Sequence, residues 1–314
     1  MTCRRLRRAL PLLVCVILAA CVASRGDEAA DIAHSAGLVA RRFDAGPFVL
    51  AGWQKPGKAE GGTLTIYLEG DGRAWINRGR IAANPTPDDP VALRLAAADP
   101  APAVLYLARP CQYVEGADFR HCAPLYWSSG RFAPDVVAAT TRAIDIAKAE
   151  TGAAKIELVG YSGGGVLALL VAARRRDVAD LITVAAPLDT AAWTRHHGVS
   201  PLSDSLDPVA VAPDLATLPQ VHFVGGKDDI VTRDVVESYR HASGEGATIQ
   251  IVSIAGYGHE CCWAANWLAR LVQARDALGR PSLTATARGP KPQRDPSITV
   301  IPAKAGIHRA ANSL

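Results

Sequence analysis

Short apolar runs alternate with segments of helical periodicity along most of this chain. Runs rich in β-branched and other apolar residues predict strands at Phe48–Trp53, Thr63–Leu68, Val104–Leu107, Lys155–Val159, Leu181–Ala185, Val221–Val224 and Thr248–Ile254. Between them, apolar spacing predicts helices at Asp135–Glu150, Val166–Ala173, Val231–Ala242 and Cys261–Leu278. This alternation favours an α/β fold, with a mostly parallel sheet covered by helices on both faces.

The first 20 residues read as a targeting segment. Four arginines precede an apolar run, Ala9–Ala20, which is too short to cross a bilayer comfortably as a helix. The run ends in Leu-Ala-Ala-Cys, which resembles a bacterial lipobox, so we expect Cys21 to be acylated after cleavage. The mature protein would then be lipid-anchored on the periplasmic side of a bacterial envelope membrane. Cys21 is followed by Val22 and not by Asp, which favours the outer membrane as the destination. The alternative is an ordinary cleaved signal with a chance cysteine.

The net charge of +4 does not belong to the folded body. Of 34 Lys and Arg, four lie in the signal segment and five after residue 280; of 30 Asp and Glu, only Asp295 lies outside residues 21–280. That body therefore holds 25 basic and 29 acidic residues, a net of −4. Since a basic surface is the usual mark of nucleic-acid binding, no nucleic-acid partner is expected.

The chain after Pro281 has no periodicity and is rich in Pro, Ala and Arg. Such composition predicts a disordered tail over residues 281–314. One folded domain is therefore expected over residues 21–280.

The strongest chemical signal is the segment Gly160–Gly164, Gly-Tyr-Ser-Gly-Gly, between a predicted strand and an apolar helix. Small residues two positions either side of Ser162 allow a sharp strand-to-helix turn that exposes its hydroxyl. The helix that follows would direct its free N–H groups toward developing negative charge. The alternative interpretation is a plain glycine-rich connection.

A serine nucleophile needs a base, and the base needs a carboxylate. His259 follows the last predicted strand within Ala-Gly-Tyr-Gly-His, where glycines let a loop present the ring. Gly-Gly-Lys-Asp-Asp follows the strand Val221–Val224. Asp228 is favoured over Asp229 as the acid, although either could instead cap the next helix.

The order Ser162, Asp228, His259 resembles that of the α/β-hydrolase superfamily over roughly residues 45–280. Two segments, Leu68–Gly72 and Arg109–Tyr113, also resemble those of a group of exported bacterial hydrolases. The resemblance implies an α/β-hydrolase fold with about eight strands and no cofactor or metal. It also implies a possible lid over residues 188–218.

The same resemblance implies an oxyanion hole. One donor would be the backbone N–H of Gly163, and the second that of Asp71 or Gly72. Many members carry His-Gly where this chain has Glu69-Gly70, so the second donor stays open. The acidic side chains here must point away from an oxyanion or pair with a cation such as Arg73.

Four cysteines remain in the predicted domain. Cys111 and Cys122 share a polar loop, and export to an oxidising compartment predicts a disulfide between them. Cys261 and Cys262 are adjacent, so they either form a vicinal disulfide or remain two thiols at a helix start.

These features predict a serine hydrolase that cleaves an ester or related acyl bond in a small-molecule or lipid-like substrate. A non-catalytic lipoprotein that uses the same scaffold to bind a ligand or envelope partner is the alternative. Thiol–disulfide exchange through Cys261-Cys262 lacks the usual Cys-x-x-Cys spacing. The pair His196-His197 lacks a suitably spaced third metal ligand.

Overall fold

An eight-stranded sheet forms the centre of the protein, in a computed structural model that describes residues 24–280. The order across the sheet is β1-β2-β6-β3-β7-β8-β9-β10; β1–β2 and β2–β6 pair antiparallel, and the other neighbours pair parallel. These strands are β1 Val39–Ala45, β2 Phe48–Gln54, β3 Thr63–Leu68, β6 Val104–Leu107, β7 Lys155–Tyr161, β8 Val178–Val184, β9 Gln220–Gly225 and β10 Ile249–Ile254. A separate hairpin joins β4 Trp75–Asn77 to β5 Arg80–Ile81.

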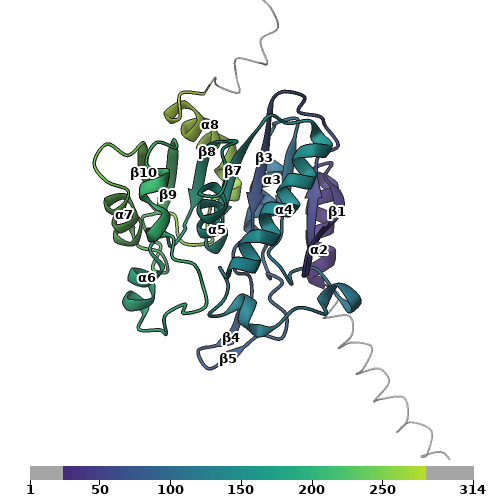
Figure 1. Ribbon diagram of the computed structural model, residues 1–314, viewed down its shortest axis with the longest axis horizontal. Coiled ribbons are helices and arrows are strands. Elements are labelled where there is room, and N and C mark those ends of the chain that lie inside the picture. The colour runs from purple at the N-terminus through teal and green to yellow at the C-terminus, as the bar shows by residue number, and fades with distance from the viewer. Residues whose placement is uncertain (1–23, 281–314) are drawn as a thin grey trace, which may run out of the picture.

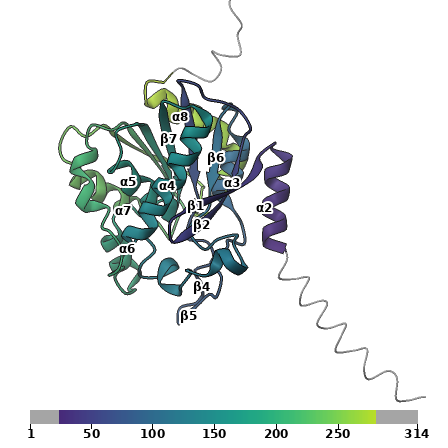
Figure 2. The same cartoon turned by 45° about the vertical axis from the view of Figure 1, so that its right-hand side comes forward.

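Helices cover both faces of this sheet (Figures 1 and 2). The α-helices are α2 Ser24–Ser35, α3 Val91–Ala98, α4 Pro134–Thr151, α5 Gly163–Ala172, α6 Thr190–His197, α7 Arg233–Ala242 and α8 Trp267–Ala277. Short 3-10 helices are η1 Gly116–Phe119, η2 Pro124–Trp127, η3 Val209–Val211, η4 Pro213–Leu215 and η5 Ala264–Asn266. One apolar core lies under α4, α5 and α7, and a second lies under α2, α3 and α8. The predicted α/β architecture is confirmed.

The central elements form where the apolar pattern predicts them. β3 and β6 have the predicted ends, and β7 extends two residues beyond its predicted end. All ten residues of α5 are buried, as expected for a helix that is apolar on every side. The last helix is shorter than predicted: a vicinal disulfide and η5 occupy the first part of Cys261–Leu278.

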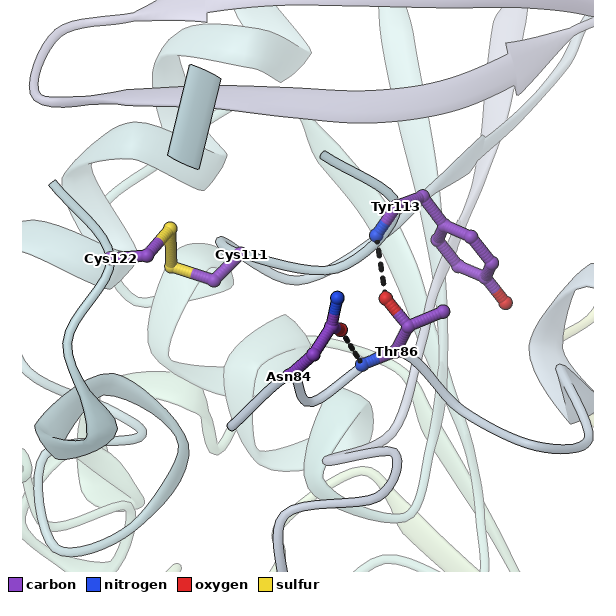
Figure 3. Close-up of a disulfide and its surroundings, with 5 residues drawn as sticks. All are labelled: Asn84, Thr86, Cys111, Tyr113 and Cys122. Atoms are coloured by element: carbon purple, nitrogen blue, oxygen red, sulfur yellow. Dashed lines mark hydrogen bonds between the residues drawn. A yellow bond between two sulfur atoms is a disulfide. The ribbon is translucent and has the colours of Figure 1, made fainter. Parts of the chain in front are cut away.

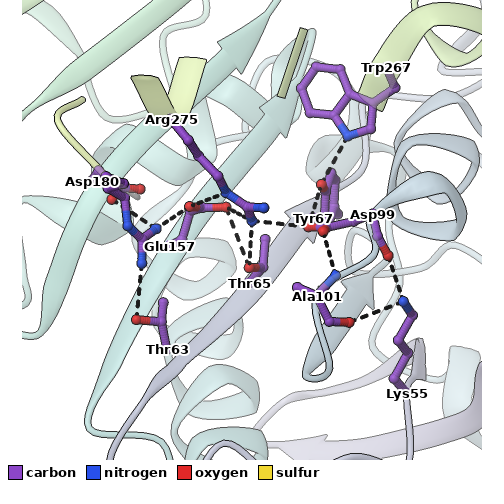
Figure 4. Close-up of polar contacts among 11 residues, drawn as sticks. Lys55, Thr63, Thr65, Tyr67, Asp99, Ala101, Glu157, Asp180, Trp267 and Arg275 are labelled. Atoms are coloured by element: carbon purple, nitrogen blue, oxygen red, sulfur yellow. Dashed lines mark hydrogen bonds and ion pairs between the residues drawn. The ribbon is translucent and has the colours of Figure 1, made fainter. Parts of the chain in front are cut away.

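A network of buried hydrogen bonds and ion pairs connects α8 to the central sheet (Figure 4). Arg275 on α8 donates to Glu157 on β7 at 2.7 Å and lies 3.3 Å from Asp99. Trp267 Nε1 donates to the Tyr67 hydroxyl at 2.9 Å, and that hydroxyl donates to Asp99. Pairing compensates these buried charges, as buried charges require.

Several expectations fall outside residues 24–280: the signal segment, the acylation of Cys21 and the tail over 281–314. Within the described residues, no helix has the length and apolar character needed to cross a membrane. The proposed lid segment, residues 188–218, contains α6, η3 and η4.

Candidate active site

The carboxyl ends of the parallel strands meet at one edge of the sheet, and the loops there carry the candidate residues. Ser162 lies between β7 and α5, Asp228 follows β9, and His259 follows β10. Asp71 follows β3. Residues up to 188 apart in sequence are thereby brought to a single site, since parallel strands direct their following loops to one edge.

Ser162 occupies a strained turn. Its φ is +50°, a left-handed value that is uncommon outside glycine. The turn closes because its flanking glycines lack side chains. A Cβ on Gly160 would lie 2.4 Å from the carbonyl oxygen of Gly164, and one on Gly164 would lie 2.2 Å from that of Leu68. The backbone conformation is that of a nucleophile elbow.

His259 connects Ser162 to Asp228. Its Nε2 lies 3.0 Å from the Ser162 hydroxyl oxygen, and its Nδ1 lies 3.0 Å from an Asp228 carboxylate oxygen. The His259 side chain is 12% exposed and that of Asp228 fully buried. The His259 carbonyl accepts hydrogen bonds from Trp263 at 3.0 Å and Tyr161 at 3.3 Å, which fix its loop.

Asp228, not Asp229, contacts the histidine. The second Asp228 oxygen accepts the backbone N–H groups of Ile230 at 2.9 Å and Val231 at 2.8 Å. Asp229 is exposed. One carboxylate oxygen of Asp228 therefore partners the base, and the other holds the loop that carries it. Neither acid caps the next helix: α7 has Thr232 as its N-cap residue, and no side chain of the described residues accepts a hydrogen bond from its first turn.

The expected oxyanion donors adjoin the serine. A Cβ on Gly70 would lie 3.3 Å from the Ser162 Cβ, so the loop after β3 passes against the elbow. Within the described residues, neither the Asp71 N–H nor the Gly163 N–H donates to another protein group. Neither amide is thus occupied by an acceptor from this part of the protein, and their role as oxyanion donors stays a prediction.

The Asp71 side chain belongs to an ion cluster that the sequence did not reveal. One carboxylate oxygen accepts from Arg109 at 2.9 Å, and the other accepts from Arg131. The expected partner, Arg73, is wrong: it lies 3.7 Å from Asp88 instead. Burial raises the pKa of Asp71, but Arg131 and Arg109 outweigh that effect and hold this pKa below its usual value.

The neighbouring carboxyl group of Glu69 has its pKa shifted in the opposite direction. It is buried and accepts the Gly70 N–H at 2.9 Å and the Tyr106 hydroxyl at 3.1 Å. Burial raises the pKa of Glu69 to about 7, and these hydrogen bonds oppose that rise only in part. Glu69 therefore titrates near neutral pH within the loop that approaches Ser162.

A disulfide joins Cys111 to Cys122, as expected (Figure 3). Beside it, the Tyr113 N–H donates to the Thr86 hydroxyl at 2.9 Å. The same loop reaches the site, because Gln112 Nε2 donates to the Gly70 carbonyl at 3.0 Å. The two segments that carry the resemblance to exported hydrolases thus lie against each other. Cys261 and Cys262 are also joined, which is the vicinal alternative.

A cavity of about 30 Å³ lies at Ser162. Asp71, Arg131, Thr190 and Trp193 are among its other lining residues, so α6 contributes to the site. Within residues 24–280, no group of three or more His, Cys, Asp or Glu side chains has a metal-binding arrangement. In the pair His196-His197, which was considered as a metal site, His197 contacts the backbone instead: its Nε2 lies 2.7 Å from the Ile230 carbonyl oxygen.

No family model matches the chain, and no curated protein matches its sequence. Solved structures share its fold. An acylaminoacyl peptidase from Pyrococcus horikoshii superposes with a TM-score of 0.56 at 14% identity, covering 77% of this chain and 41% of that one. The esterase from Pyrococcus furiosus gives 0.52 at 10% identity, covering 78% and 92%. The chain has the α/β-hydrolase fold.

Est1E from Butyrivibrio proteoclasticus shares this α/β-hydrolase fold, with a TM-score of 0.51 at 12% identity over 76% of this chain and 96% of that one. By contrast, the chain spans only about two fifths of the puromycin hydrolase and acylaminoacyl peptidase chains that it matches. At these identities the likeness concerns the α/β-hydrolase fold, and function must be argued from the site.

Proposed function

We propose that this protein is a serine hydrolase that cleaves an acyl ester through an acyl-enzyme intermediate on Ser162. The observation that carries the proposal is the unbroken chain of hydrogen-bonding atoms from the Ser162 hydroxyl through His259 to Asp228, with both distances 3.0 Å. A serine at a strained turn, a partly exposed histidine and a buried carboxylate meet the geometric requirements of such a triad.

The geometry assigns one role to each side chain. The Ser162 oxygen attacks the carbonyl carbon while His259 Nε2 accepts its proton. His259 then gives that proton to the leaving alkoxide, and the acyl group remains on Ser162. Next, His259 accepts a proton from a water molecule, which attacks the acyl-enzyme. The bond to the Ser162 oxygen then breaks, His259 returns its proton to that oxygen, and the carboxylic acid is released. Asp228 accepts the Nδ1–H, holding the tautomer and stabilising the imidazolium.

Two backbone amides that have no protein acceptor in the described part of the chain would stabilise the oxyanion in each tetrahedral intermediate. The Gly163 N–H begins α5, where the helix dipole also favours negative charge. The Asp71 N–H comes from the neighbouring loop, while its side chain is neutralised by arginines. Each donor of this kind contributes about 3 kcal/mol to transition-state stabilisation. This mechanism requires neither a metal nor an organic cofactor.

An ester is the proposed bond because its alkoxide departs more readily than an amine. Structural likeness to both esterases and a peptidase is compatible with either bond. The test is hydrolysis of 4-nitrophenyl esters of increasing acyl length, beside an acyl-peptide 4-nitroanilide, by wild type and Ser162→Ala. We expect turnover of esters by wild type alone. Equal rates for both proteins would contradict the proposal, and cleavage of the anilide alone would replace esterase with peptidase.

We also propose that the enzyme is anchored to the periplasmic face of a bacterial envelope membrane, the outer membrane being favoured, through acylated Cys21. The support is the sequence Leu-Ala-Ala-Cys after an arginine-led apolar run. Labelling of the expressed protein with an alkyne fatty acid tests this. Label on wild type that is lost in Cys21→Ala is the expected result, and equal label on both would contradict it.

A further inference from the structure

A groove of about 700 Å³ opens beside the cavity at Ser162. It lies between the β4–β5 hairpin and the end of α6, which occupy the same edge of the molecule in Figures 1 and 2. Its apolar walls include Trp75, Ile81 and Val199. Three residues, Arg131, Trp193 and Leu202, line both the groove and the cavity, so the two spaces share a boundary.

The charge of this groove is opposite to that of the body. Its lining residues include Arg131 and Arg78 but no Asp or Glu, although residues 21–280 carry a net of −4. The carboxylates beside it are already engaged. Asp71 is held between two arginines; Asp204 accepts the Ser129 hydroxyl at 2.6 Å and keeps its charge, but it is exposed and is not among the residues that line the groove. The groove therefore favours an anionic occupant.

Arg131 is the cation best placed to contact that occupant. Its Nε donates to the Ser128 carbonyl at 2.8 Å, and its Nη1 donates to Asp71. Within the described chain, its Nη2 donates to no protein group. Arg109 shares the same carboxylate, so two guanidiniums face one negative charge. The side chain of Arg109 is 5% exposed and that of Arg131 10%, and of the two only Arg131 is among the residues that line the groove.

The cluster also connects Arg131 to the reacting atoms. Asp71 packs so closely on the elbow that a Cβ on Gly163 would lie 2.2 Å from a carboxylate oxygen. Gly163 directly follows Ser162. An anion bound by Arg131 would thus lie next to the acyl group, held by a guanidinium that is already oriented.

We propose that Arg131 binds a carboxylate of the substrate, so the natural substrate is an acidic ester with an apolar portion along Trp75 and Trp193. This inference rests on the proposed function, because it names the substrate class of the same site. The carboxylate could belong to the acyl chain or to the alcohol. Both sources present the same chemistry to the guanidinium.

Two matched pairs of esters test the proposal with the mature enzyme. In the first pair, 4-nitrophenyl hydrogen glutarate and its methyl ester place the charge on the acyl chain. In the second, 3-carboxyphenyl butyrate and its methyl ester place it on the alcohol. We expect kcat/KM to be about 10- to 100-fold higher for the acidic member of one pair, the gain typical of a hydrogen bond to a charged group. Added salt should reduce this ratio.

Variants of the groove arginines test which side chain causes the preference for the acidic ester. Arg131→Met should abolish the ratio, and Arg131→Lys should retain part of it. Because Arg131→Met also leaves Asp71 with one partner fewer, Arg78→Met provides a second variant at an exposed groove position and should lower the ratio more modestly. Arg142→Met, which removes an exposed arginine from α4, is the matched control and should leave it unchanged.

The outcomes separate this inference from the function on which it rests. Equal kcat/KM for both members of both pairs in wild type would overturn the inference and leave the esterase intact. An acidic preference that survives in both Arg131→Met and Arg78→Met would also overturn it. Hydrolysis of none of the four esters would overturn the proposed function, and this inference with it.

Discussion

Asp228 has each of its carboxylate oxygens committed to a different task. One lies 3.0 Å from His259, and the other accepts two backbone N–H groups of the loop that carries it. This second set of bonds orients the carboxylate toward the histidine before any substrate arrives. Because a neutral amide cannot hold the histidine in the required tautomer, the charge and shape of this one side chain should matter greatly.

Asp228→Asn should therefore lower kcat of ester hydrolysis by about 10⁴-fold with little change in stability. Asp229→Asn is the matched control: this neighbour is exposed, and its replacement should change the rate less than about 3-fold, within the small effects usual for surface substitutions. Steady-state kinetics on both variants check the prediction. Similar losses in the two would show that the acid had been misassigned.

Because the pKa of Glu69 is raised in the folded protein, we expect the free energy of unfolding to depend on pH. Its pKa in the folded protein is about 7, above the ordinary value of 4.5, so the folded state retains a proton that the unfolded state loses. The resulting stabilisation is complete below about pH 4.5 and is lost as the pH rises through about 7. At about 1.4 kcal/mol per unit of pKa, the full loss is about 3 kcal/mol.

Gln cannot titrate at position 69. As the pH rises from 4.5 to 8, the free energy of unfolding of Glu69→Gln should therefore increase by about 3 kcal/mol relative to that of the wild type. Urea denaturation of both proteins at each pH measures this difference, and other titrating groups cancel in it. Glu245→Gln, at an exposed loop position, should show no such change. A constant difference between Glu69→Gln and wild type would rule out a raised pKa.

At the scale of the elements, the disulfide loop and the loop after β3 act as a unit. The disulfide joins two cysteines 11 positions apart in sequence. Beside Cys111, Arg109 contacts Asp71 and Gln112 contacts Gly70. The disulfide therefore constrains the unfolded chain and also holds the loop that supports the proposed oxyanion donor.

Replacing both Cys111 and Cys122 by Ala should destabilise the protein by about 3 kcal/mol, the loop-closure entropy for a loop of this length. Guanidinium denaturation under oxidising conditions measures it. Cys261→Ser with Cys262→Ser is the matched control, since neighbouring residues close almost no loop and the entropic loss should be small. An unchanged midpoint in the first double variant would contradict this role.

Elements with strong local patterns could be predicted from sequence, and weakly patterned ones could not. β3 and β7 are apolar runs, and α4 shows clear helical spacing ended by Gly152. β1 was missed because Val-Ala-Arg-Arg-Phe-Asp-Ala has three charged residues among seven and no regular alternation; it is a mostly exposed edge strand that pairs with β2. α3 and α6 are eight residues each, too short for a distinct period.

The same limit applies within the site. Ser162 and His259 could be identified because glycines surround each in a recognisable local pattern. Arg131 could not, because its contact with Asp71 joins residues 60 apart and nothing near Arg131 indicates it. The pairing of Asp71 with Arg73 was wrong for that reason: the nearest cation in sequence is not the nearest in space.

At the scale of the whole molecule, the charge is divided by region. Residues 1–20 and 281–314 hold the positive excess, and residues 21–280 carry −4. Against this acidic body, the groove beside Ser162 is lined by arginines without an acid among its lining residues. A field of this kind would draw anionic substrates to one edge of the protein, and its effect should weaken with salt.

The central claim is that Ser162 is a nucleophile activated by His259 and Asp228. Its most direct test is reaction of the purified mature protein with a fluorophosphonate at neutral pH, followed by mass spectrometry of the peptides. We expect one phosphonyl adduct, on Ser162, and slow or absent reaction in Asp228→Asn. No adduct on folded wild-type protein, or an adduct on another serine, would contradict it.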